Sequence, residues 1–96
     1  MSMIELQAEF ADELFQNLNN AGLSVSTHKE ERYFGDSASI LMILDIANNT
    51  IGIAASIIAI WAIKHNATIK INDVEHKPTT QEVDKEEIKK KLDQEK

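Results

Sequence analysis

The stretch Ile51–Ile63 constrains the fold of this 96-residue chain more than any other segment. It contains no charged side chain, and only Gly52 and Ser56 interrupt its run of aliphatic and aromatic residues. A membrane span needs roughly 20 apolar residues, so this stretch is better suited to a helix buried within a protein. We therefore expect a helix that is apolar over most of its circumference and needs cover on several sides.

A longer apolar segment, Ile40–Ile63, has the length of a membrane span. Its composition argues against one, because Asp45 would cost about 2.5–3.5 kcal/mol near the bilayer centre, whereas each large apolar residue returns about 0.3–0.6 kcal/mol. The polar run 48–50 adds to that cost. We expect no membrane span, and the absence of a basic, apolar leader at the start favours a cytoplasmic location.

The region 37–65 is predicted to be one long apolar helix. Unbroken, it would extend about 43 Å at 1.5 Å per residue, which is long for a domain of this size. A break near 48–50, where Asn48-Asn49-Thr50 interrupt the apolar residues, is the alternative and would give two packed helices.

Apolar side chains recur every three or four residues over 3–20, which predicts a first helix. Gly22 is suited to a left-handed cap at its end. Ile4, Leu6 and Ala8 also alternate with polar residues, so a short strand before a shorter helix is the competing prediction.

Alternation of apolar and polar residues predicts strands over 23–28 and 67–72, with a third short strand near 79–83 as an option. The last segment, 84–95, is predicted to be a helix with Asp84 as its N-cap. Together these elements predict a single α/β domain that covers the whole chain.

A strand–helix–strand passage normally makes a parallel pair through a right-handed crossover. We therefore expect a small sheet of two or three strands with a parallel pair of this kind. Three to four helices should pack on it, the central apolar helix being continuous or broken near 48–50.

Five small or polar residues of the central segment are spaced by 4, 3, 4 and 3 positions, which places them on one side of a helix. They are Asp45, Asn49, Gly52, Ser56 and Ala59. In one interpretation this smooth strip lets the helix lie close to the rest of its own chain. In the other, Gly52 and Ser56 form a close-packing seam between two copies. Because the other elements supply little apolar cover, we expect self-association, with a dimer preferred.

No catalytic, cofactor-binding or metal site is predicted. His28, His65 and His76 belong to different elements and have no second ligand at metal-binding spacing. The chain has no cysteine, and its three glycines do not form a phosphate-binding loop. Asp45 must meet a partner, reach water or take up a proton, but no catalytic helper stands near it in the sequence. We expect a protein that is not an enzyme.

The charge balance bears on the class of partner. Sixteen acidic against ten basic side chains give a net charge of −6. Binding to nucleic acid depends on Lys and Arg that displace condensed counterions, so neither nucleic acid nor an anionic lipid surface is an expected partner. A protein partner is expected, and a basic protein surface is compatible with this charge.

A pattern of segments carries a family resemblance. A glycine precedes a predicted apolar helix over 35–41, and a small-residue interruption follows over 48–52. A second apolar helix is predicted to end in Trp61 and Lys64, and Ile69–Ile71 and a terminal helix come after it. Over about two-thirds of its length the chain thus resembles the effector-associated constant component domains of bacterial conflict systems. The resemblance implies an adaptor or regulator coupled to effectors in bacterial or phage conflict, without catalytic residues.

Two other functions are compatible with the sequence. One is an immunity or anti-defence inhibitor that masks a basic target, which predicts that Glu and Asp cluster on one face of the folded chain. The other is a small membrane-active protein that uses 51–63.

Overall fold

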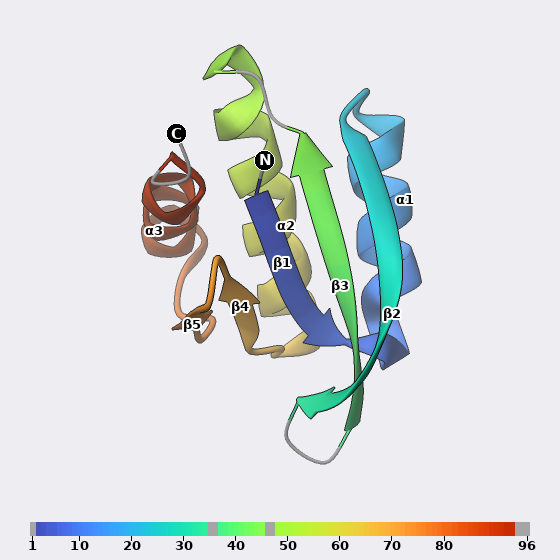
Figure 1. The fold of residues 1–96 in the computed structure, drawn as a ribbon. Coiled ribbons are helices and arrows are strands. Elements are labelled where there is room, and N and C mark those ends of the chain that lie inside the picture. The colour runs from blue at the N-terminus through green and yellow to red at the C-terminus, as the bar shows by residue number, and fades with distance from the viewer. Residues whose placement is uncertain (1, 35–36, 46–47, 94–96) are drawn as a thin grey trace.

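The computed structural model describes residues 2–34, 37–45 and 48–93. Figure 1 shows a sheet in front of a layer of helices. The strands are β1 (Ser2–Gln7), β2 (Ser24–Phe34), β3 (Ser37–Asp45), β4 (Ile69–Ile71) and β5 (Val74–His76). The helices are α1 (Ala11–Asn20), α2 (Ile51–His65) and α3 (Gln81–Asp93), with short 3-10 turns at η1 (Ala8–Phe10) and η2 (Asn48–Thr50).

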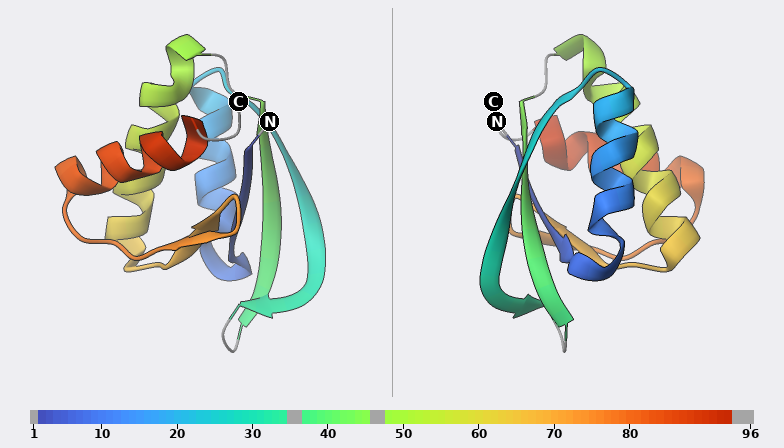
Figure 2. Two further views of the ribbon diagram at one scale, coloured as in Figure 1. Left: turned by 60° about the vertical axis from the view of Figure 1, so that its left-hand side comes forward. Right: turned by 90° about the vertical axis from the view of Figure 1, so that its right-hand side faces the viewer.

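The five strands form one sheet in the order β2-β3-β1-β4-β5, and every neighbouring pair is antiparallel. The helix α1 connects β1 to β2 and α2 connects β3 to β4, and each connection skips one strand position. This split β-α-β arrangement, repeated once, is the topology of ferredoxin-like sheets. All three helices lie on one face of the sheet, as the side views in Figure 2 show.

The expected sheet of two or three strands with a parallel pair is therefore wrong. The strands β3 and β4 do run in the same direction around α2, but β1 lies between them and pairs with both. The rule that joins a strand–helix–strand passage into a parallel pair assumes adjacent strands. Insertion of the N-terminal strand replaces that pair with two antiparallel ones.

The N-terminal helix predicted over 3–20 is correct only in its second half, because residues 2–7 form β1 and the helix begins at Ala11. The competing prediction, a short strand before a shorter helix, is the one the structure has. Burial explains the outcome: Ile4 and Leu6 point into the core, with no exposed surface. Gly22 follows the helix with φ of +87°, as a left-handed cap requires.

The long helix predicted over 37–65 is also wrong, because its first third is the strand β3 and only residues 51–65 form α2. The break predicted near 48–50 exists as the turn η2, but it separates a strand from a helix. In β3, the buried Met42 and Leu44 alternate with Leu41 and Ile43, which are apolar too. With no polar alternation, apolar periodicity does not distinguish this strand from a buried helix.

The remaining predicted elements have shifted boundaries. The strand predicted over 23–28 overlaps β2, which begins at Ser24 and is longer, and the strand predicted over 67–72 contains β4. The optional third strand near 79–83 is wrong, because α3 begins there at Gln81 and the last strand is β5, before it. The helix predicted over 84–95 starts three residues earlier, and residues 94 and 95 lie outside the described part of the chain.

The core lies between the inner face of the sheet and the helices. The sheet contributes alternate residues of its three central strands, and α2 contributes a row of small side chains. Fully buried members include Ile4, Leu6, Met42, Leu44, Ile69 and Ile71 from the sheet, and Leu14, Leu18, Ala55, Ile58 and Ile88 from the helices.

Candidate protein-binding surface on α2

Helix α2 is apolar on both its inner and its outer side. Its inner side belongs to the core that the sheet and the helices share, and the backbone of α2 approaches that of α3 more closely than that of any strand. Ala54, Ala55, Ile58, Ala59 and Ala62 have no exposed surface, and Ile51 and Trp61 are buried beside them. This half of the helix needs no cover beyond what this chain supplies.

The outer side of α2 carries four isoleucines that recur at intervals of three or four residues, and so lie on one side of the helix. We call Ile53, Ile57, Ile60 and Ile63 the outer isoleucine face. Ile53 and Ile60 are 48% and 49% exposed, and Ile63 is 36% exposed. The first charge in the helix is Lys64, in its last turn. Three turns of a surface helix thus present only apolar and small side chains to solvent.

The structure separates the residues of the predicted seam. Asp45 is exposed at the end of β3 and Asn49 is exposed in η2, so neither belongs to the helix. Ala59 is fully buried in the core of its own chain. Only Gly52 and Ser56 lie half-buried beside the outer isoleucine face. The regular spacing would place the five residues on one side of a helix only if a single helix continued through 45–59, and the structure has no such helix.

Gly52 has no structural explanation within the described part of the chain. A Cβ atom at this position would have no neighbour within 4 Å, and its φ angle is not one that excludes side chains. A glycine inside a helix is less favourable than alanine by about 1 kcal/mol. The close approach that glycine permits is therefore available on the solvent side of α2.

The C-terminal end of α2 is bound to α1 and η1. The indole N–H of Trp61 donates to the Phe10 carbonyl oxygen at 3.0 Å. The Glu13 carboxylate contacts His65 at 2.8 Å and Lys64 at 3.2 Å. The rings of Phe10 and His65 stack with centroids 4.1 Å apart. The hydrogen bond from His65, followed by that from Lys64, lowers the pKa of Glu13 below its ordinary value.

Helix α3 packs against α2 through Ile88 and Leu92 and is held at its start by Asp84. The Asp84 side chain is fully buried and accepts hydrogen bonds from the Thr79 N–H at 2.8 Å and the Thr79 hydroxyl at 2.6 Å. His76 Nε2 lies 3.2 Å from the same carboxylate, within ion-pair distance but without hydrogen-bond geometry. Asp84 is not the N-cap that the sequence predicts, because α3 begins at Gln81. It fixes the preceding loop to the helix.

The polar clusters around Glu13 and Asp84 each join a helix to a neighbouring segment. In the second cluster the Asp84 carboxylate accepts from the Thr79 hydroxyl and lies 3.2 Å from His76 Nε2. Among the residues placed in the structure, no group of three or more His, Asp or Glu is arranged to hold a metal ion. Both clusters hold elements against α2.

Sequence reasoning did not separate the outer isoleucine face from the buried side of α2. The available signal was that the helix is apolar all round, which shows that some apolar residues face outward but not which ones. In the parts of the chain that the structure covers, no helix combines the length and the apolar character that a membrane span requires. Comparisons with protein-family models, with curated proteins and with solved structures find no match to this chain.

Proposed function

We propose that this chain is a non-catalytic protein-binding module that pairs with a second copy of itself through the outer isoleucine face of α2. The observation that supports it is the exposure of Ile53 and Ile60, each close to one half, on a helix with no charge before its last turn. Large exposed apolar patches on a protein surface mark interaction sites. Each buried Å² of such surface contributes about 25 cal/mol.

The net charge restricts where a second copy can bind. The chain carries a net charge of −6, so two copies repel each other over most of their surfaces. The uncharged outer isoleucine face is where they meet without like-charge contacts. Gly52 and Ser56, beside the isoleucines, let two helix backbones approach closely.

An antiparallel pair of α2 helices fits the spacing of the isoleucines. A two-fold axis between Ser56 and Ile57 sets Ile53 of each copy against Ile60 of the other, because the axis lies midway between them. At 1.5 Å per residue α2 is only about 22 Å long, whereas a stable interface covers about 800 Å² on each partner. The flanks of α1 and α3 therefore complete the contact.

Light scattering coupled to size exclusion tests this pairing. The native chain should have twice the monomer mass of 10.8 kDa, and Ile60→Gln should shift the mass toward the monomer. Met3→Gln is the matched control, since Met3 is 40% exposed on β1 and lies outside α1, α2 and α3. A native chain that is monomeric at all concentrations contradicts the proposal. So does a native chain that floats with phospholipid vesicles while Ile60→Gln does not, because the outer isoleucine face would then bind lipid.

The biological role follows from the resemblance to effector-associated constant component domains. We propose that the paired module acts as an adaptor or regulator in a bacterial or phage conflict system.

An immunity or anti-defence inhibitor is the second candidate, and a specific observation favours it: Glu5, Asp45 and Glu75 lie on one face of the sheet. A pull-down with an effector encoded beside this chain, followed by an assay of the bound effector, would support the adaptor role if the effector remained active and the inhibitor role if it lost activity.

A further inference from the structure

The face of the sheet opposite the helices is a second surface with its own chemistry. Figure 2 shows the helices on one side only, and the described residues place no helix over the other side. Strand pairing sets Met3 opposite Ile43 on this outward side, and Leu41 opposite Glu5. Met3, Leu41 and Ile43 thus form an apolar centre on the outward faces of β1 and β3, and we call this side the open sheet face.

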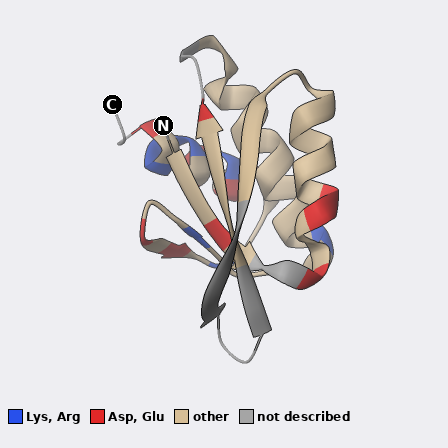
Figure 3. Ribbon diagram, turned by 45° about the vertical axis from the view of Figure 1, so that its right-hand side comes forward, with Lys and Arg blue, Asp and Glu red and all other residues tan. Residues whose placement is uncertain are grey.

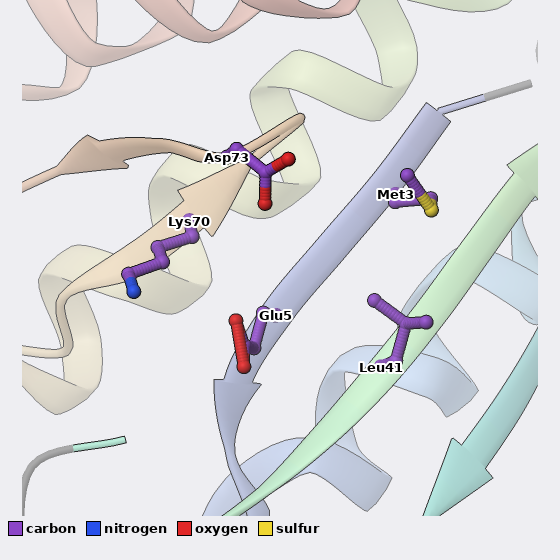
Figure 4. Close-up of a pocket in the computed structure, with 5 residues that line it drawn as sticks. All are labelled: Met3, Glu5, Leu41, Lys70 and Asp73. Carbon is purple, nitrogen blue, oxygen red and sulfur yellow. The ribbon is translucent and has the colours of Figure 1, made fainter. Parts of the chain in front are cut away.

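A shallow hollow of about 250 Å³ lies beside this apolar centre. Met3 and Leu41 line one side of it, and Glu5, Lys70 and Asp73 line the other, as Figure 4 shows. The hollow therefore has an apolar wall from β1 and β3 and a charged wall from β1, β4 and the turn after β4. It is large enough for one aliphatic side chain.

Acidic residues surround the apolar centre. Asp45 ends β3, and Asp73 and Glu75 lie in and after the turn that follows β4. Among the outward positions described on β1, β3, β4 and β5, Lys70 is the one cation. Figure 3 shows acidic positions in red on β1, at the end of β3 and at β5, and basic positions in blue on β4 and on α3. The open sheet face is thus apolar at its centre and negative around it.

We infer that the open sheet face binds a basic protein segment that presents an aliphatic side chain between arginine or lysine residues. The aliphatic side chain enters the hollow between Met3 and Leu41, and the cationic groups contact Asp73 on one side and Asp45 on the other. Charge complementarity of this kind selects the partner and raises the association rate. A second copy does not fit here, because its own carboxylates would face these.

The position of this surface is independent of the proposed self-pairing. The outer isoleucine face and the open sheet face lie on opposite sides of the molecule, so both can be occupied together (Figure 2). A pair joined through α2 then presents two open sheet faces outward. Two linked sites bind a partner with repeated basic segments more tightly than either site alone.

An NMR titration of the ¹⁵N-labelled full chain tests the inference. The probe is the capped peptide Arg-Leu-Arg-Leu-Arg, compared with Glu-Leu-Glu-Leu-Glu and with Arg-Gly-Arg-Gly-Arg. We expect amide shifts in β1, β3 and β4 with the first peptide, weaker shifts with the glycine peptide and none with the acidic one. Shifts confined to the helices, or equal binding of all three peptides, would overturn the inference.

Matched charge variants sharpen the test. Asp73→Asn and Asp45→Asn should each weaken binding about two- to fivefold, as expected for exposed ion pairs. Asp73 has φ of +69°, which asparagine tolerates, so the turn keeps its conformation. Asp12→Asn removes the same charge from exposed α1 on the helical side and should leave the affinity unchanged. An equal loss in all three variants would show only non-specific charge attraction and contradict a site on the sheet.

Discussion

The inner and outer halves of α2 have the same chemistry and different surroundings. Both halves consist of aliphatic side chains, but Ile58 on the inner side has no exposed surface and Ile60 on the outer side is half exposed. The sheet, α1 and α3 cover one half and leave the other to solvent. Because burial and not composition separates them, the inner half stabilises the fold and the outer half is available for association.

The largest predicted effect is a difference in the free energy of unfolding between one substitution on the inner side of α2 and one on its outer side. Ile58→Ala should lower the free energy of unfolding by about 2–5 kcal/mol, because it leaves a cavity in the core. Ile60→Ala should change that of the monomer by no more than about 0.5 kcal/mol. Chemical denaturation at concentrations low enough for monomers checks both. Equal losses would mean that the two halves of α2 do not differ as described.

The second-largest predicted effect on the free energy of unfolding concerns α3, which packs against one flank of α2. Asp84→Ala should lower the free energy of unfolding by about 2–3 kcal/mol, because the N–H and hydroxyl of Thr79 lose their buried acceptor. Glu86→Ala, an exposed position in the same helix, is the control and should change it by less than about 0.5 kcal/mol. Thermal denaturation of the two variants side by side measures the difference. Similar melting temperatures would contradict an anchoring role for Asp84.

The smallest effect concerns the contact between α1 and the end of α2. The pKa of Glu13 in the folded chain lies below its ordinary value of 4.5. Its carboxylate therefore stabilises the fold above that pH, and the contribution is lost as the pH falls through the lowered pKa. Glu13→Gln should destabilise the fold near neutral pH and make the acid-induced loss of stability shallower.

Urea denaturation at a series of pH values from neutral to acidic measures this contribution. Glu9→Gln removes an exposed carboxylate from the preceding turn and is the control. Parallel pH profiles for the native chain and Glu13→Gln would show that the contacts of Glu13 with His65 and Lys64 do not stabilise the fold.

The elements with regular periodicity were predictable from the sequence, and the topology was not. The second half of the first helix and α3 follow from their apolar spacing and from signals such as Gly22, and α2 follows from the length of its apolar run. The strand β3 was mistaken for a helix because Leu41 and Ile43 on its outward side are as apolar as its buried residues. The alternation of Ile4 and Leu6 indicated the strand β1, but sequence spacing gave no information on its place in the sheet, between β3 and β4.

The candidate site was predictable only in part, for the same reason. Gly52 and Ser56 were identified by their size, but their relation to Asp45 and Ala59 depended on a helix that does not extend through all four positions. Which side of α2 faces solvent depends on how α1, α3 and the sheet pack around it. That packing is a property of the whole fold and is not encoded in the local spacing of α2.

Disulfide cross-linking of single-cysteine variants tests the proposed pairing most directly, because the native chain has no cysteine. A disulfide forms when two Cα atoms lie about 4.4–6.8 Å apart, and the proposed two-fold axis beside Ser56 would bring the two copies of this residue within that range. Under mild oxidation Ser56→Cys should convert to a covalent dimer, and Ser24→Cys, exposed at the start of β2, should remain monomeric. A monomeric Ser56→Cys, or equal cross-linking of both variants, would contradict self-association through α2.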